Sequence, residues 1–248
     1  MNPPLILAHR GARRYAPENT ISAFKKVIEL KLDGVEFDVQ STSDGLPVVI
    51  HDDNLHKLTG RHLHLHKTPY VDIINLDAGR QFSPYFSGEG IPTFKDVLAV
   101  FKGTGMLLNV ELKSQARQNK NFVPRVIETI KDAGLESQVL VSSFSRELLY
   151  KVGRAAPYLK RSLLLRPRAF FFLDVLFSAT ILAVCGINPH ISILNKYLMR
   201  YANARGMNVM TWAANEPDEI RKAIKLGVLG IITDEPLLAK EIIKEIYG

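Results

Sequence analysis

The strongest constraint on the fold is the regular alternation of short apolar segments with amphipathic segments along the chain. The apolar segments have the length of β-strands, and the amphipathic segments repeat their apolar residues at helical spacing. Repeated strand–helix units favour a parallel sheet, and this number of units predicts a closed barrel. The expected strands end near His9, Val39, His51, Leu112, Phe144, Leu165, Asn188, Trp212 and Ile232, and the expected helices cover 19–30, 93–101, 122–134, 145–157, 196–206 and 217–227.

One expected strand is too many for an eight-stranded barrel, and the segment "VEFDVQSTSDGLPVVIHD" accounts for it. Asp44-Gly45 is a typical turn between two apolar runs, which are too close in sequence for a crossover helix. Residues 47–51 are therefore expected to fold back antiparallel on the second strand. A two-residue loop pairs Asp38 with His51, and a register shifted by one step pairs Glu36 with His51. Eight parallel strands then remain.

Length and composition favour one domain over residues 1–248. Apolar residues form 46% of the 248-residue chain, which is enough for a large core. Residues 53–91 break the strand–helix rhythm and are expected to form an inserted subdomain. The predicted fold class is therefore α/β, a TIM (β/α)8 barrel with a small insertion after the hairpin of the second strand.

Composition also bears on the compartment and on the partners. Cys185 is the single cysteine, which excludes an internal disulfide and fits a reducing compartment. The first residues lack the pattern of a signal peptide, so a cytoplasmic location is expected. The net charge of +7 suits an anionic partner, but no nucleic-acid-binding motif accompanies it. Nucleic acid is therefore not an expected partner, and no oligomeric state follows from the sequence.

The segment "AFFFLDVLFSATILAVCGI", residues 169–187, has the length of a membrane span. Asp174 interrupts it, and a strand-like ending follows. A buried helix followed by a buried strand is therefore the preferred interpretation. The alternative is a peripheral contact with the membrane surface through residues 170–177.

Two carboxylates share one face of the second strand. Side chains alternate along a strand, so Glu36 and Asp38 point the same way and repel each other. In a parallel barrel both faces of a strand are covered, which makes a solvated acidic pair a poor explanation. A divalent cation with oxygen ligands, Mg²⁺ or Ca²⁺, would relieve the repulsion. His51 is expected beside this pair, where it suits general acid/base chemistry.

A third strand repeats the pattern. In "MLLNVELKS", Asn109, Glu111 and Lys113 share one face. Glu111 adds a third carboxylate, and Lys113 adds a cation for an anionic substrate. Together with His9 and Arg10, these groups lie near the carboxyl ends of strands, where barrel enzymes build their active sites. The combination predicts metal-assisted attack on a phosphate ester.

Nine segments resemble a known family in their order along the chain. They are "AHRGARRYAPENTISAF", "DGVEFDVQSTSDGLPVVIHDDNLHKLTG", "INLDAG", "IPTFKDVL", "LLNVELK", "VSSF", "INPH", "TWAANE" and "LGVLGIITDEP". The family is the glycerophosphodiester phosphodiesterases, and the resemblance runs from about residue 5 to residue 236. It implies a TIM barrel that hydrolyses glycerophosphodiesters to sn-glycerol 3-phosphate and an alcohol with a divalent metal, in lipid and glycerol metabolism.

The resemblance also implies roles for individual residues. Two histidines would act as general acid and base, three carboxylates would bind the metal, two cations would hold phosphate oxygens, one asparagine would support the site from the first helix cap, and one aromatic residue would line the pocket. In that order the positions are His9 and His51; Glu36, Asp38 and Glu111; Arg10 and Lys113; Asn19; and Trp212.

Two other functions remain open. The apolar stretch 170–177 would suit a greasy pocket mouth and a lysophospholipase D-like activity on lysophospholipids. A barrel that binds ligands without catalysis is the second alternative, against which the complete set of acids and histidines argues.

Three histidines of "RHLHLHK" lie at alternate positions. On a strand, His62, His64 and His66 would share a face and could bind zinc. No acid or cysteine accompanies them in the segment, so a solvated β-ribbon is the preferred interpretation.

Overall fold

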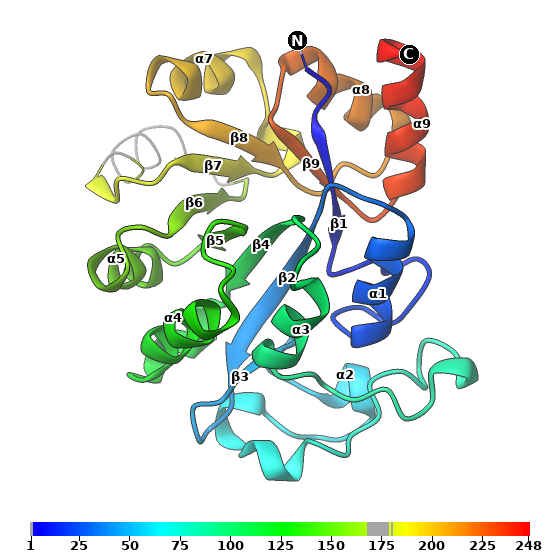
Figure 1. The fold of residues 1–248 in the computed structure, drawn as a ribbon, viewed down its shortest axis with the longest axis vertical. Coiled ribbons are helices and arrows are strands. Elements are labelled where there is room, and N and C mark those ends of the chain that lie inside the picture. The colour runs from blue at the N-terminus through cyan, green and yellow to red at the C-terminus, as the bar shows by residue number, and fades with distance from the viewer. Residues whose placement is uncertain (1, 168–178, 180) are drawn as a thin grey trace.

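The structure, a computed structural model, describes residues 2–167, 179 and 181–248 and contains a closed parallel barrel (Figure 1). Eight described strands form the barrel in the order β1-β9-β8-β7-β6-β5-β4-β2, and a β1–β2 pairing closes it. The predicted fold class is therefore confirmed. The barrel strands are β1 Leu5–His9, β2 Gly34–Ser41, β4 Leu107–Leu112, β5 Val139–Ser143, β6 Lys160–Leu165, β7 Gly186–Pro189, β8 Asn208–Thr211 and β9 Gly230–Thr233.

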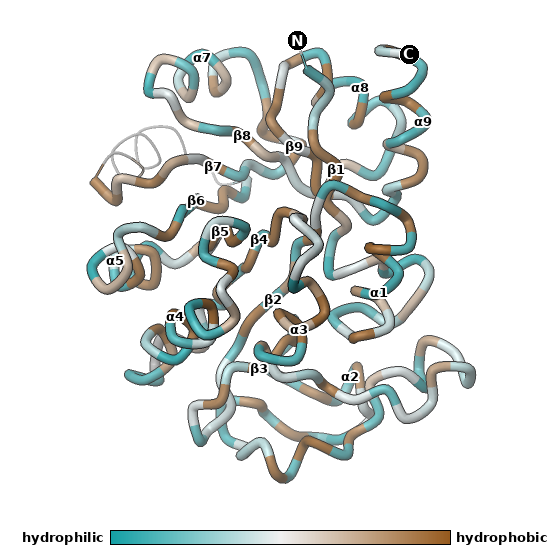
Figure 2. The backbone as a smooth tube through the Cα atoms, in the orientation of Figure 1, coloured by the Kyte–Doolittle hydropathy of each residue, from teal (hydrophilic) through white to brown (hydrophobic). Residues whose placement is uncertain are grey.

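Helices surround this barrel (Figure 1). Thr20 caps the first helix by accepting from the backbone nitrogen of Ala23, and Ser145 caps the helix Arg146–Ala155 (α5) by accepting from the backbone nitrogen of Leu148. In Figure 2 hydrophobic and hydrophilic residues alternate along β2, while the outer helices mix both kinds of residue. The outer helices are α1 Ile21–Glu29, α3 Phe94–Phe101, α4 Phe122–Ala133, α5 Arg146–Ala155, α7 Lys196–Ala204, α8 Pro217–Leu226 and α9 Pro236–Tyr247.

The main core lies between the barrel and these helices. Phe24 of α1 meets Phe37 of β2 and Phe101 of α3 edge to face, at ring-centroid distances of 5.4 and 5.7 Å. All three rings are fully buried. Because Phe37 points outward into this core, its neighbours Glu36 and Asp38 must point into the barrel.

The hairpin predicted after β2 forms, but both predicted registers are wrong. β3 Pro47–Val49 pairs antiparallel with β2, with Val39 opposite Val49. The loop has three residues rather than two, because the Thr42 backbone nitrogen donates to the Leu46 carbonyl and Gly45 adopts a left-handed φ of 82°. The backbone nitrogen of Ile50 consequently donates to the backbone carbonyl of Asp38, and His51 lies beyond the ladder in a bend.

Residues 50–93 connect β3 to α3 and pack around a cluster of their own, at the bottom of Figure 1. Its buried members include Leu55, Leu65 and Ile73, together with Val48 and Ile50 of the hairpin. The predicted β-ribbon around the three histidines is wrong, since an isolated bridge and 3-10 turns occupy that segment. The short elements are α2 His56–Thr59, η1 Leu65–Lys67, η2 Tyr70–Asp72 and η3 Pro84–Phe86.

Within the described residues, no helix is long and apolar enough to cross a membrane. Most of the apolar segment 169–187 lies outside the described residues, including residues 170–177, for which a membrane contact was the alternative interpretation. The segment ends as the sequence predicts, in the buried strand β7.

Gly11 provides a test of how β1 joins α1. Its φ of +80° is left-handed, and a Cβ added there would lie 2.8 Å from the Cβ of Ala23 in α1. We expect Gly11→Ala to lower the free energy of unfolding by about 2 kcal/mol or more through backbone strain and this contact, as measured by urea denaturation.

The matched control is Gly103→Ala. Gly103 has the same φ of +80°, but nothing lies within 4 Å of the added Cβ. This variant measures the effect of backbone strain alone. An equal decrease in the free energy of unfolding in both variants would therefore contradict a role for the Ala23 contact.

Candidate active site

A cavity of about 510 Å³ opens at the carboxyl ends of the barrel strands. Seven of the nine residues implied by the resemblance line it, while Asp38 and Asn19 lie behind its wall. The lining residues are His9, Arg10, Glu36, His51, Asp52, Asp53, Asn109, Glu111, Lys113, Ser114, Gln115, Phe144, Leu164, Arg166, Trp212 and Ile232.

Three buried carboxylates converge at the inner end of this cavity. The β2–β4 register sets Asp38 beside Glu111, and the β1–β2 register sets His9 beside Glu36. One oxygen from each of Glu36, Asp38 and Glu111 lies within 4.8 Å of the others. These residues are 4%, 1% and 8% exposed, so water screens their repulsion poorly. The two strands thus bring the predicted acids together.

The electrostatics of the three acids differ. Burial, together with the charges of Asp38 and Glu111, raises the pKa of Glu36 well above its ordinary value. Burial and the nearby Asp38 raise the pKa of Glu111 to about 7, although Lys113 opposes this shift. Asp38 is also buried, but Lys113 and Arg10 outweigh burial and lower its pKa. The site therefore holds one carboxylate, Asp38, that the nearby cations keep firmly ionised. The ionised forms of the other two, Glu36 and Glu111, are not fully compensated by nearby positive charge.

Two cations lie against these acids. The Lys113 ammonium nitrogen lies 2.9 Å from Glu111 and 3.2 Å from Asp38. The Arg10 guanidinium lies 3.4 Å from Asp38 and donates to Glu18 at 2.9 Å. Burial alone would lower the pKa of both bases, but the surrounding carboxylates raise it. Both side chains therefore carry a permanent positive charge at the cavity.

The backbone is strained where it supports the acids. Arg10 and Asn19 both adopt left-handed φ values, of 55° and 58°. In this conformation the Arg10 backbone nitrogen donates to Glu36 at 3.0 Å, and the Asn19 amide donates to Asp38 at 2.9 Å. The Asn19 backbone nitrogen in turn donates to the Arg10 carbonyl. Non-glycine residues in this region store strain that is typical of functional sites.

Each histidine of the site has a carboxylate on its Nδ1. His9 Nδ1 lies 2.8 Å from Asp234, which follows β9, and His51 Nδ1 lies 2.7 Å from Asp52. This leaves Nε2 as the available nitrogen, and the Nε2 of His9 lies 3.8 Å from Glu36. Burial and the nearby cations lower the pKa of His51, although Asp38 opposes them.

The wall of the cavity that faces the acids is aromatic and carries another cation, Arg166. Trp212 is fixed by a hydrogen bond from its indole nitrogen to the Asn188 carbonyl at 2.8 Å. The Phe144 ring meets Trp212 edge to face, and the Arg166 guanidinium lies 4.0 Å from the Phe144 centroid. Leu164 and Ile232 add apolar surface.

Sequence reasoning missed several of these partners. Asp234, Asp52 and Glu18 orient the predicted His9, His51 and Arg10. Asp234 had a usable signal, because it directly follows the last strand and therefore lies at the carboxyl end of the barrel.

The donor set fits a hard divalent cation. Three carboxylate oxygens that converge in a buried cavity are the ligands of Mg²⁺ and Ca²⁺. The raised pKa values of Glu36 and Glu111 indicate that further positive charge would stabilise the ionised site. Asn109 also borders the cavity, and both polar atoms of its buried amide lack a partner among the described residues.

The pKa of Glu111 predicts a pH dependence of stability for the metal-free chain. Between its ordinary value of 4.5 and about 7, the unfolded chain releases this proton while the folded chain keeps it. Stability should therefore fall as pH rises through this window, by up to about 3 kcal/mol from Glu111. In urea denaturation with chelator present, the free energy of unfolding of Glu111→Gln minus that of the wild-type chain should increase from pH 4.5 to pH 7.

The control for this measurement is Glu241→Gln on the exposed face of α9. The free energy of unfolding of Glu241→Gln should equal that of the wild-type chain at every pH. A difference between Glu111→Gln and the wild type that is constant with pH would contradict the assigned shift.

Comparison with known proteins adds independent information. The profile of the glycerophosphoryl diester phosphodiesterase family matches residues 9–238. A glycerophosphodiester phosphodiesterase of Caldanaerobacter subterraneus subsp. tengcongensis is 34% identical over 232 residues, which cover 94% of each chain. The human protein named lysophospholipase D GDPD1 is 26% identical, over 93% of this chain and 83% of its own.

A solved structure agrees with the sequence comparisons. The Oleispira antarctica phosphodiesterase in complex with the product sn-glycerol-3-phosphate has a TM-score of 0.89 and 27% identity, over 97% of each chain. The matched segment begins at His9 and continues past Asp234, so it includes every site residue described above. The chain belongs to the glycerophosphoryl diester phosphodiesterase family.

Proposed function

We propose that this chain hydrolyses glycerophosphodiesters to sn-glycerol 3-phosphate and an alcohol with the help of a divalent metal ion. Glu36, Asp38 and Glu111 would hold the ion, and His9 and His51 would transfer the protons. The observation that carries the proposal is the convergence of three buried carboxylates beside both histidines in one cavity. Membership of the family supports the same reaction.

The cations of the site bind the substrate phosphate. When bound, the Mg²⁺ or Ca²⁺ ion supplies positive charge that stabilises the phosphoryl oxygens in the transition state. Arg10 and Lys113 add donors at the same cavity, since both side chains are charged and line it. Asn19 keeps Asp38 and Arg10 in position from behind the wall.

The two histidines transfer protons through Nε2, because Nδ1 is hydrogen-bonded to a carboxylate in each. One ring takes the proton of the attacking hydroxyl group as its oxygen bonds to phosphorus. The other ring gives a proton to the alcohol oxygen as its bond to phosphorus breaks. The attacking group is water, or the neighbouring hydroxyl of the substrate, which would form a cyclic phosphate first.

Replacement of either histidine tests this assignment. His9→Ala and His51→Ala should each lower kcat by about 100-fold or more in a glycerophosphodiester assay, since general acid/base catalysis contributes this much. Circular dichroism should remain that of the wild type.

The matched control is His56→Ala in α2, where the ring is exposed and stacks on His62 at a centroid distance of 3.9 Å. It should keep wild-type turnover. Turnover near the wild-type value in His9→Ala or His51→Ala would refute the catalytic assignment.

Metal removal and a substrate panel test the rest of the proposal together. Chelator should abolish hydrolysis of glycerophosphocholine and glycerophosphoinositol, and added Mg²⁺ or Ca²⁺ should restore it. The reason is that the ion held by the three carboxylates would supply the positive charge that stabilises the phosphoryl oxygens. Release of sn-glycerol 3-phosphate is the measurement. Undiminished activity in chelator would contradict metal dependence.

A lysophospholipase D-like activity is the second candidate. The apolar wall of Phe144, Leu164, Trp212 and Ile232 favours it, because an acyl chain could lie against such a surface. The human relative named lysophospholipase D supports it as well. Adding lysophosphatidylcholine to the same panel separates the two candidates: turnover there above that of glycerophosphocholine would favour lysophospholipids.

Other expectations remain proposals. We retain the single domain over residues 1–248 with its inserted subdomain at 53–91, the cytoplasmic location and a small-molecule substrate. The peripheral membrane contact through residues 170–177 is an alternative that lies outside the described residues. A non-catalytic binding barrel is disfavoured by the family membership.

A further inference from the structure

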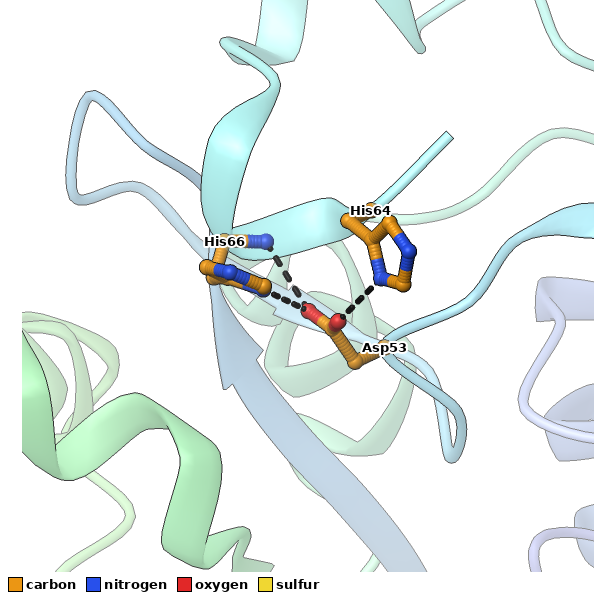
Figure 3. Close-up of side chains that lie close together, drawn as sticks. All are labelled: Asp53, His64 and His66. Atoms are coloured by element: carbon orange, nitrogen blue, oxygen red, sulfur yellow. Dashed lines mark hydrogen bonds and ion pairs between the residues drawn. The ribbon is translucent and has the colours of Figure 1, made fainter. Parts of the chain in front are cut away.

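A second cluster of potential metal ligands lies apart from the three acids, where the insertion meets the cavity. Figure 3 shows the rings of His64 and His66 on either side of the Asp53 carboxylate, each directed at a different oxygen. The Nδ1 of His64 lies 2.8 Å from Asp53 Oδ2, and the Nδ1 of His66 lies 2.7 Å from Oδ1. The ligand atoms of the three residues lie within 4.8 Å of one another.

The residues of this cluster differ from the three histidines that the sequence suggested. The expectation that no acid accompanies the histidines is wrong, because the fold brings Asp53 to them from eleven residues earlier. His62 is not part of the cluster and stacks on His56 instead. The 3-10 turn at residues 65–67, rather than a strand, brings His64 and His66 together.

The cluster is anchored to the protein interior on one side and open to solvent on the other. Leu65, between the two histidines, is fully buried in the small core of the insertion. Its backbone nitrogen donates to the Asp53 carbonyl at 2.8 Å, and the His66 backbone nitrogen donates to Asp53 Oδ1 at 3.0 Å. The side chains of His64 and His66 are 51% and 39% exposed, whereas that of Asp53 is 17% exposed. An ion can therefore reach ligands that need little rearrangement.

The carboxylate is suited to an ion at neutral pH. Partial burial works against ionisation of Asp53, but hydrogen bonds from His66 and His64 outweigh it and lower the pKa of this carboxyl. A neutral imidazole that carries its hydrogen on Nε2 offers the Nδ1 lone pair to a metal ion, so the Nδ1 atoms that face Asp53 are the candidate ligand atoms.

We propose that Asp53, His64 and His66 bind a divalent transition-metal ion of the Zn²⁺ type. Imidazole nitrogens favour such ions, whereas Mg²⁺ and Ca²⁺ prefer the oxygen-only set of Glu36, Asp38 and Glu111. Three protein ligands leave a fourth position of a tetrahedral ion open to water. The chain thus carries two sites of different ligand chemistry.

The position of this site connects it to the cavity. Asp53 lines the cavity together with His51 and Asp52, the residues just before it in the chain. An ion on Asp53 would place positive charge at the cavity rim and tie the segment of His64 and His66 to its wall. It would also stabilise the folded chain, since the ligands come together only in the fold.

Calorimetric titration with Zn²⁺ in excess Mg²⁺ tests the proposal, because Mg²⁺ fills the oxygen-only site. The wild-type chain should bind one Zn²⁺ beyond any that displaces Mg²⁺. His64→Asn and His66→Asn should weaken this binding at least tenfold. Asparagine keeps an N–H donor for Asp53, which preserves the local fold, but it lacks the imidazole ligand.

His62→Ala is the matched control, since it removes an imidazole of the same segment that lies outside the cluster. It should bind Zn²⁺ as the wild type does. Zn²⁺ should also raise the Tm of the wild type and of His62→Ala, but not of the asparagine variants. Unchanged Zn²⁺ affinity in His64→Asn and His66→Asn, or an equal loss in His62→Ala, would overturn the proposal.

Discussion

Repulsion among three buried carboxylates is the constraint on which the rest of the site depends. Glu36, Asp38 and Glu111 are brought together by the register of β2 and β4, and this register cannot slip without turning the side chains into the outer core. Arg10 and Lys113 balance the charge of Asp38 but leave Glu36 and Glu111 with raised pKa values. The fold thus holds negative charge in place, and the proposed divalent ion would complete the balance.

The neighbouring features follow from that constraint. The left-handed Arg10 and Asn19 direct their donors at the acids, and Gly11 allows β1 to turn immediately toward α1. Each histidine is fixed through Nδ1 by a carboxylate from outside the acidic trio. Among the described residues, two of the four left-handed non-glycine residues therefore lie in the segment that joins β1 to α1, directly beside the acids.

The sequence predicted the barrel and most of the candidate site, because both depend on local pattern. Strand alternation was sufficient to align Glu36 with Asp38, and the carboxyl ends of consecutive strands were sufficient to bring them near His9. The sequence pattern was not sufficient to predict the hairpin register, which depends on the left-handed backbone conformation of Gly45. The pairing of His9 with Asp234 was missed as well, since 225 residues separate them and the β1–β9 pairing that closes the barrel brings them together.

The small core of the insertion has a consequence for how the protein can vary. It includes Val48 and Ile50 of the hairpin, and Ile50 directly precedes His51. One histidine of the pair is therefore supported by the barrel, and the other by a separate packing unit of the insertion. Substitutions in that unit could shift His51 and the Asp53 rim while the acids and the barrel stay in place. If His51 transfers a proton as proposed, this second packing unit offers a way to change the position of His51 without changing the packing of the barrel.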